Sequence, residues 1–582
     1  MTSSSDRRGR RLWRSAMVFA MGTALPACTP GAQFPKMPPV AESENPAADT
    51  RPNIVLIVAD DLGYSDIGAF GGEIPTPHLD ALAARGAQLV NFYVSPACSP
   101  TRAMLLTGRD NHAAGFGTMV EVAVGDQRGA AGYEGYIPRD VPTIAERLRD
   151  AGYRTMMSGK WHLGSGPGQG ADGRGFQHSY ALTQGMANHF GADQSPGFVR
   201  HKAAPTYRLN GQVVTYPQGQ YSSQVFSDQL MSFLPDKSSH DPQARAPFFA
   251  YLAFTAPHWP LQAPAEAIER NRGRYNAGPG AIARGRIERM TRSGLIAADL
   301  KTRVETDDSG WSGLNADERA RQARMMEVYA AMVEEMDAAV GRIVARLQAD
   351  GELENSYIIF MSDNGAEGLI FEGPSNRTDR GSPLPVDVDN SIGNIGAANS
   401  WVSYGPLWGQ ASSSPWWGTK EHTSEGGIRS AAIVSGPGIP GGTRERSVLH
   451  VRDVFPTLLS IAGIESAAPS SDSEFFPRDM LPLLEDPAED PLPREGDVFW
   501  ELFFRAAIRQ GDMKAIYQPT RVPVLGKLTA PGEVSWQLYN LAADPGETND
   551  LASRQPQSLA DLQSQWRRHA DQLGVVLLPE DR

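Results

Sequence analysis

The stretch NIVLIVA, at residues 53–59, is followed at once by the letters DDLG. An unbroken run of apolar and mostly β-branched residues is typical of a parallel strand that is buried on both faces. Further strands are predicted at residues 154–157, 248–254, 357–361 and 431–434, and helices at residues 77–86, 141–152 and 325–347. Because strands and helices alternate, the sequence predicts an α/β fold with a large, mostly parallel sheet flanked by helices.

The pattern changes after about residue 470. Short strands at meander spacing are predicted at residues 498–500, 506–509, 514–517 and 536–541, followed by a helix at residues 558–573. This pattern indicates a small α+β domain in which an antiparallel sheet packs against one helix. We therefore predict a main domain at residues 51–470 and a small C-terminal domain at residues 471–582.

Two of the predicted strands end in polar clusters. Asp60 and Asp61 follow the first strand, and Asp363 and Asn364 follow the strand at residues 357–361. Either pair alone could be a solvated turn. Since ligands gather at the carboxyl ends of strands in open α/β sheets, we expect both pairs on one rim, where buried carboxylates need a positive partner. Three carboxylates and an amide oxygen favour a hard cation, Ca²⁺ ahead of Mg²⁺.

Cationic and proton-transferring side chains also lie next to predicted strands. Lys160 and His162 lie in the segment GKWHLG, His258 lies in TAPHWP, and Lys420 precedes EGGIR. Lysines suit the oxygens of an anion, and histidines can donate or accept protons near neutral pH. Taken singly, each of these residues is more often a surface or core residue than a functional one.

The segment CSPTR, at residues 98–102, is followed by LLTG at residues 105–108. Alone, it could be a buried cysteine near a proline turn. The other motifs of the chain argue against that reading. The sequence contains, in this order, DD, CSPTR, GKWH, APHWP, SDNG and a lysine before EGG. With these motifs the chain resembles the type I (formylglycine-dependent) sulfatases of the alkaline-phosphatase-like superfamily, in particular bacterial arylsulfatases. The resemblance extends over residues 51–575 and includes WQLYNL and DPGE near the C-terminus.

The resemblance implies that Cys98 is oxidised to formylglycine (3-oxoalanine) by a formylglycine-generating enzyme. A hydrated aldehyde carries two hydroxyls on one carbon, so that one can attack sulfur and the other can expel sulfate by re-forming the aldehyde. A serine could accept the sulfate group but has no second hydroxyl with which to expel it. The implied reaction is hydrolysis of a small-molecule sulfate monoester, an aryl sulfate being expected, to sulfate and a phenol or alcohol.

The resemblance also implies roles for the remaining motif residues. One Ca²⁺ ion would be held by Asp60, Asp61, Asp363, Asn364 and an oxygen of the modified Cys98. Lys160, Lys420 and His258 would bind the sulfate group, Arg102 would stabilise the hydrated aldehyde, Asp363 and His162 would act as bases, and His258 would help to protonate the leaving oxygen. This placement agrees with electrostatics, because cations belong where negative charge develops on the SO₃ group and the leaving oxygen.

Composition restricts the functions that are open to the chain. It has 582 residues, 41% hydrophobic and 21% charged, as in ordinary globular proteins, and a net charge of −13. Nucleic acid is therefore excluded as a partner, since no basic stripe is available to neutralise phosphates. Cys28 and Cys98 are the only cysteines, so no structural disulfide is expected. We expect a monomer.

The N-terminus resembles a bacterial lipoprotein signal. Arginines between residues 7 and 14 form a basic region, residues 15–25 are apolar, and the segment LPAC ends at Cys28, which would become the lipid-bearing residue. We predict a signal peptide at residues 1–28 and a flexible tether at residues 29–50, rich in Pro and Ala. The protein would then be exported, periplasmic or membrane-anchored; the alternative is a disordered extension of a cytoplasmic protein.

Two long segments without predicted elements are candidates for binding loops. Residues 365–418 are dense in Gly, Pro, Ser and Asn and contain five aromatic residues, Trp401, Tyr404, Trp408, Trp416 and Trp417. These rings could stack on an aryl leaving group, or they could simply fix the loop to the body. Residues 109–135 are expected to form the opposite wall of the site.

Three functions remain open from the sequence. The first is a calcium-dependent arylsulfatase. The second is a hydrolase of phosphonate or phosphate esters from the same superfamily, which the pattern of Lys160, His162 and Lys420 disfavours. The third is a calcium-binding surface lipoprotein whose Cys98 is never converted and which has no catalytic activity.

Overall fold

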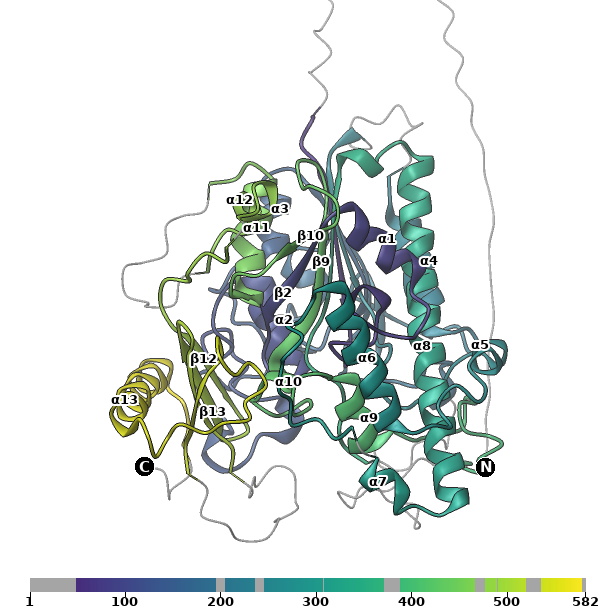
Figure 1. Ribbon diagram of the computed structural model, residues 1–582. Helices are drawn as coiled ribbons and strands as arrows, with labels where there is room; N and C mark the ends of the chain where they lie inside the picture. Colours follow the sequence, from purple (N-terminus) through teal and green to yellow (C-terminus); the bar gives the residue numbers. More distant parts are fainter. Residues whose placement is uncertain are drawn as a thin grey trace, which may run out of the picture. The chain divides into compact units, whose positions relative to one another are not determined.

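Strand β1 (Asn53–Ala59) forms where the sequence predicts it, and each of its seven residues is buried. The computed structural model describes residues 49–194, 205–235, 245–306, 308–370, 388–465, 477–488, 490–519 and 535–577. Within these residues β1 is an interior strand of an 11-stranded sheet with the order β10-β2-β9-β8-β1-β7-β3-β4-β5-β6, to which β11 is added beside β2 (Figure 1).

The other strands of the large sheet are β2 (Ala87–Tyr93), β3 (Arg154–Lys160), β4 (His178–Leu182), β5 (Tyr207–Leu209), β6 (Gln212–Val214), β7 (Phe248–Ala253), β8 (Ser356–Ser362), β9 (Arg429–Ser435), β10 (Thr443–Glu445) and β11 (Leu449–His450). Pairing is parallel around β1, β3, β7 and β8. Strand β9 is antiparallel to both of its neighbours, β2 and β8, and β5 is antiparallel to β4 and β6. The predicted α/β class with a mostly parallel sheet is confirmed.

Side chains of β1 alternate between two hydrophobic cores, as the two-residue period of a strand requires. Val55 and Ile57 pack in one core with helices α1 (Pro77–Arg85), α4 (Ser222–Phe233) and α8 (Ala316–Ala349). Leu56 and Val58 pack in the other core with α2 (Cys98–Thr107), α3 (Ile144–Asp150), α11 (Val454–Ile461) and α12 (Leu481–Glu485). Figure 1 shows these two groups of helices on opposite faces of the sheet.

Capping determines where two of the predicted helices begin. Helix α8 starts nine residues before the predicted residue 325, because the Asn315 side chain caps Glu318 N at 2.9 Å and Glu318 caps Asn315 N in return at 2.8 Å. Helix α3 starts later than the predicted 141, because Thr143 and Glu146 form a similar capping box. Further helices are α5 (Ala265–Arg270), α6 (Pro279–Ser293), α7 (Ser309–Ser312), α9 (Gly405–Ser412) and α10 (Glu425–Ile428).

The chain also forms a separate antiparallel sheet, as predicted. Its strands are β12 (Val498–Leu502), β13 (Arg505–Gln510), β14 (Met513–Tyr517) and β15 (Gln537–Asn540), in that order. Helix α13 (Pro556–Leu573) packs on this sheet through Trp566, whose ring stacks on the ring of Phe499 with the two centroids 5.6 Å apart. The predicted boundary at residue 470 and the predicted signal peptide, tether and Cys28 lie outside the described residues. None of the described helices has the length and apolarity that crossing a bilayer requires.

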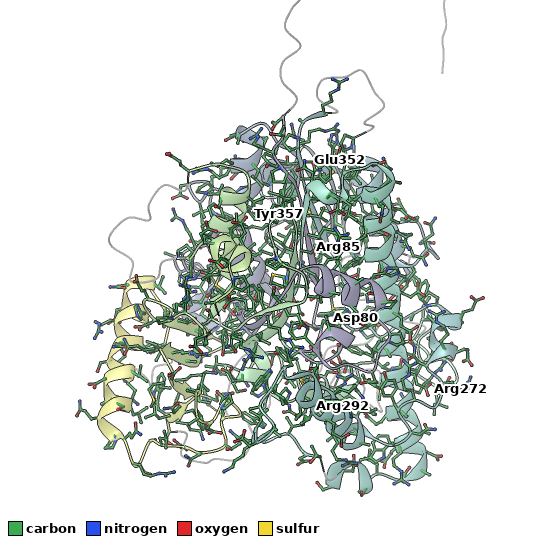
Figure 2. All side chains as sticks on the ribbon, turned by 45° about the horizontal axis from the view of Figure 1, so that its top comes forward. Asp80, Arg85, Arg272, Arg292, Glu352 and Tyr357 are labelled. Carbon is green, nitrogen blue, oxygen red and sulfur yellow. The ribbon has the colours of Figure 1, made fainter. Side chains whose placement is uncertain are left out.

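At the amino ends of β1 and β8, polar contacts hold the two strands together. Asn53 donates a hydrogen bond to Glu352 at 2.8 Å, and Figure 2 labels Glu352 close to Tyr357, the second residue of β8.

A buried histidine joins the small sheet to the segment that follows α2. His112 Nδ1 lies 3.1 Å from Asp110, and His112 Nε2 lies 3.0 Å from Glu501 on β12. Burial disfavours the imidazolium, but the two carboxylates outweigh burial and raise the pKa of His112 to about 9. The protonated ring is therefore a structural cation.

This histidine should make stability depend on pH. Its folded-state pKa lies above the unfolded value of about 6.5, so the stabilisation is complete below pH 6.5 and is lost as the pH rises through 9. Urea unfolding should show the wild type losing up to about 3 kcal/mol between pH 6 and pH 9.5. His112→Gln should be less stable at pH 6 and should lack this part of the decline, whereas the exposed His78→Gln should behave as wild type. An identical decline in His112→Gln would contradict the assignment.

Candidate active site

The predicted site residues converge on one rim of the large sheet because of strand order. Strands β3, β7, β1 and β8 are consecutive and parallel, so their carboxyl ends lie side by side. The residues at or just after these ends are Lys160, His258, Asp60 with Asp61, and Asp363 with Asn364. This arrangement confirms that the two acidic strand ends share one rim.

Two further segments reach the same rim from neighbouring strands. Since β9 runs antiparallel to β8, its amino end lies at this rim, and Lys420 comes from the segment before β9. Strand β2 is antiparallel to β9 and leads at its carboxyl end to Cys98, the first residue of α2. Backbone hydrogen bonds fix these segments: Lys420 N donates to Ala366 O at 2.8 Å, and Glu421 N donates to Pro96 O at 2.7 Å.

Three buried aspartates on the rim are each paired with a buried cation. Lys160 Nζ lies 2.7 Å from Asp60 Oδ2, and Lys420 Nζ lies 2.9 Å from Asp61 Oδ2. Arg102 Nε lies 2.9 Å from Asp363 Oδ2. The side chains of Asp60, Lys160 and Arg102 are completely inaccessible to solvent. Paired in this way, the three negative and three positive charges balance, which is the condition for burying them.

Cys98 and His258 face the same two aspartates. Cys98 Sγ lies 3.3 Å from Asp60 Oδ1 and 3.8 Å from Asp61 Oδ1, and His258 Nε2 lies 3.6 Å from Asp61 Oδ2. The donor atoms of these four residues all lie within 4.8 Å of one another, so the cluster could hold a metal ion.

Asn364 also fits a cation at this position. Its Nδ2 donates to Asp61 Oδ1 at 2.7 Å, while its buried Oδ1 accepts no hydrogen bond. A half-turn of the amide exchanges these two atoms and presents the oxygen instead. With the carboxylates, this gives the all-oxygen donor set that a hard divalent cation prefers.

Burial and charge act in opposite directions on the titratable groups of the site. Burial raises the pKa of Asp61, but the charges of Lys420, His258 and Lys160 together outweigh it and keep that pKa below its usual value. For Asp363, burial and the neighbouring Asp60 raise the pKa. Burial also raises the pKa of the Cys98 thiol, and burial lowers the pKa of His258 to about 3 although Asp61 opposes this shift. The unmodified thiol is therefore a poor nucleophile here.

His162 has a different partner from the rest of the predicted site. Its Nε2 lies 3.0 Å from Glu121 Oε1, in the short 3-10 turn at Val120–Val122, and its buried Nδ1 has no hydrogen-bond partner. Among the described residues, no hydrogen bond or ion pair connects its ring to the rim carboxylates. Glu121 was not singled out from the sequence, although residues 109–135, which contain it, were expected to form a wall of the site.

Glu367 is a second residue that the sequence motifs do not single out. Its Oε2 lies 3.6 Å from Lys420 Nζ and accepts a hydrogen bond from Trp259 Nε1 at 3.3 Å. Burial raises its pKa to about 7 although Lys420 opposes the shift. Its position three residues after Asn364, on the loop that leaves β8, is the signal that could have indicated it.

Most aromatic residues of the segment 365–418 do not line the site. Trp408 packs on Tyr275 and Trp311, Tyr404 packs on Tyr329, and Trp416 packs on Tyr64, all within the main core. The suggestion that these three rings stack on a leaving group is therefore wrong, because they anchor the loop. Trp401 differs, since it contacts the half-buried Trp259 beside His258, with ring centroids 6.4 Å apart.

Two residues of the predicted site have a strained backbone. Asp61, with φ of 64°, and His162, with φ of 54°, adopt left-handed conformations that cost non-glycine residues about 1 kcal/mol or more. Strain of this kind persists at functional sites when the surrounding structure over-determines it.

The fold and this rim define a class: ester hydrolases of the alkaline-phosphatase-like fold. The sulfatase family matches residues 52–464 of the chain. A sulfatase of Schizosaccharomyces pombe, itself uncharacterized, is 40% identical over 556 residues, 92% of this chain and 96% of the relative. An arylsulfatase of Klebsiella aerogenes is 40% identical over 433 residues, 73% of this chain and 90% of the relative. The crystal structure of Ps i-CgsB, 26% identical, has a TM-score of 0.60 and covers 89% of this chain and 93% of that chain.

The chain therefore belongs to the sulfatase family. It is a sulfuric ester hydrolase, and the resemblance noted from its motifs is confirmed.

A substitution at Gly159 would test the geometry of the rim. Its φ is 115°, and an added Cβ would lie 1.8 Å from Ala253 O on the adjacent β7, so Gly159→Ala should displace Lys160. We expect a loss of about 3 kcal/mol or more in urea unfolding together with loss of sulfatase activity. Gly351→Ala is the matched control, because Gly351 also has positive φ (72°) but open space around it. Equal effects of the two substitutions would contradict the close approach of β3 and β7.

Proposed function

We propose that this sulfatase hydrolyses aryl sulfate monoesters, using formylglycine derived from Cys98 and one bound Ca²⁺ ion. The observation that carries the proposal is the position of Cys98. It begins α2 at the rim, with its Sγ 3.3 Å from Asp60, and the two aspartates beside it are the ones that hold Lys160 and Lys420.

The rim residues fit a calcium site. Asp60, Asp61, Asp363 and Asn364 would hold the ion together with an oxygen of the modified Cys98, as the hard oxygen donors and the unpartnered Asn364 Oδ1 support. When bound, the ion would supply positive charge that favours an ionised nucleophile and a developing sulfate oxyanion. It would also replace Lys160 and Lys420 as counter-charge of the aspartates and leave both ammonium groups available to an anion.

The cations of the rim would bind the sulfate group and orient the groups that react with it. Lys160, at the end of β3, and Lys420, in the segment before β9, would bind its oxygens as point charges. Arg102, held by Asp363 at 2.8 Å, would orient that carboxylate, which is placed to take a proton from the nucleophilic hydroxyl. His162, oriented by Glu121, would accept the proton of the second hydroxyl when sulfate departs.

His258 is suited to the leaving oxygen. Its Nδ1 is bonded to the Trp259 carbonyl at 2.5 Å, which fixes the ring and turns Nε2 toward the rim. An anionic sulfate group beside the ring would oppose the desolvation that lowers its pKa and would favour the protonated form. Beside it, the half-buried Trp259, which Trp401 contacts edge to face, offers an apolar ring against which an aryl group could pack.

Two alternatives are separated from this proposal by direct measurements. A preference for phosphate or phosphonate esters would appear as a faster rate on the phosphate than on the sulfate of the same phenol. An unconverted protein without activity would contain intact Cys98 when isolated from its native host. We further propose export as a lipoprotein through Cys28, on the strength of the arginine-rich and apolar N-terminal pattern.

Maturation can be tested on the tryptic peptide of residues 86–102. Mass spectrometry should show an aldehyde in place of the Cys98 thiol, because a thiol has no second hydroxyl with which to expel sulfate. Cys98→Ala should be inactive, and Cys98→Ser should release at most one equivalent of phenol. Sustained turnover by either variant would falsify the proposed nucleophile.

The two histidines should separate kinetically. Loss of a proton donor matters most for poor leaving groups, so His258→Ala should slow alkyl sulfates far more than nitrophenyl sulfate. Loss of the base for the second step does not depend on the departed alcohol, so His162→Ala should give a burst of phenol followed by slow turnover. Either deficit should be about 100- to 10,000-fold. If the burst occurs in His258→Ala instead, the two roles are exchanged.

A further inference from the structure

A second cavity lies beside the small antiparallel sheet. Its volume is about 590 Å³, which is in the range of small-molecule sites. It is lined by Tyr93 and Arg429 from the large sheet, by Leu295 and Ile296 after α6, and by Arg509 of β13. The rim residues assigned to sulfate hydrolysis do not line it.

The buried charges at the wall of this cavity are not balanced. Of this group the cations Arg429 and Arg509 line the cavity, and Lys514, Glu425 and Glu547 are joined to Arg429 by ion pairs; all five residues are less than 10% exposed. Lys514 Nζ lies 2.7 Å from Glu425 and 2.8 Å from Glu547, and Arg429 Nη1 lies 3.3 Å from Glu425. Three positive and two negative charges leave an excess of one positive charge, and an uncompensated buried charge is costly.

The unbalanced positive charge lies on Arg509. Its guanidinium donates to the Tyr93 hydroxyl at 2.7 Å and to Gly511 O at 2.8 Å, and within the described part of the chain it forms no ion pair with a carboxylate. Only 7% of the residue is exposed, and it lines the cavity. The ligand that this arginine lacks is an anion.

The mouth of the cavity adds positive charge and an apolar wall. Arg446 lies at the mouth, donates to Gly294 O at 2.7 Å and has no carboxylate partner among the described residues. Opposite charge is sparse, since Asp512 is the acidic residue in the lining. Leu295, Ile296 and the Trp416 ring line the cavity as well, and such surfaces suit a hydrocarbon or aromatic body.

We propose that this cavity binds a small organic anion, with its carboxylate or sulfonate head at Arg509 and Arg446 and its apolar body against Leu295, Ile296 and Trp416. The site is separate from the sulfatase rim and does not depend on conversion of Cys98. An inorganic anion would satisfy the charge but leave the apolar wall in water, and a neutral aromatic compound would leave Arg509 without a counter-ion.

The test measures binding of 1-naphthalenesulfonate by calorimetry, with 1-naphthol and inorganic sulfate as comparison ligands. Arg446→Ala should weaken naphthalenesulfonate binding about tenfold, as loss of one charge-assisted hydrogen bond implies. Arg444→Ala is the matched control, because Arg444 lies two residues before Arg446, in β10, and also donates to a carbonyl at the end of α6, Ser293 O at 2.6 Å, but does not line the cavity. It should bind as wild type, and 1-naphthol and sulfate should each bind at least tenfold more weakly than the sulfonate.

Binding at the sulfatase rim alone would leave Arg446→Ala and Arg444→Ala equal to wild type, and this result would overturn the proposal. A second variant, Arg509→Met, tests the buried end; its folding is verified by its unfolding temperature. A folded Arg509→Met protein that binds naphthalenesulfonate as tightly as wild type would also overturn it. Weakened binding in Arg446→Ala, with Arg444→Ala unchanged, would support it.

Discussion

Balance among buried charges at one rim of the sheet is the constraint on which the rest of the structure depends. Asp60, Asp61 and Asp363 are each paired with a cation that comes from a different part of the chain. Removing one partner from such a pair typically costs about 3–5 kcal/mol. The strand order, the left-handed backbone at Asp61 and the tight passage of Gly159 past β7 all serve to bring these six side chains together.

Charge pairs of the same kind attach the small sheet to the large one. His112 lies between Asp110 and Glu501, and Lys514 lies between Glu425 and Glu547. Glu425 begins α10, directly after the segment that carries Lys420. The ion pair between Lys514 and Glu425 therefore also supports the active-site rim. The small sheet is therefore part of the framework of the site.

The sequence predicts the strands and their polar ends well, because apolar runs such as those of β1 and β8 have a local signature. It does not predict that β9 runs antiparallel, which is the reason that Lys420 reaches the rim, since pairing direction is a tertiary property. Glu121 and Glu367 cannot be predicted from the sequence, because a lone glutamate in a loop carries no pattern. The sequence leaves two roles open for the rings of Tyr404, Trp408 and Trp416, because composition does not distinguish a core anchor from a binding surface.

In the proposed mechanism a divalent cation would take over the aspartates and make Lys160 and Lys420 available to sulfate. Calorimetric binding of inorganic sulfate to the metal-free protein and to the calcium-loaded protein tests this claim most directly. Calcium should strengthen sulfate binding at least about tenfold, and by reciprocity sulfate should strengthen calcium binding by the same factor. Equal sulfate affinity with and without calcium, or no binding of calcium at all, would contradict the account.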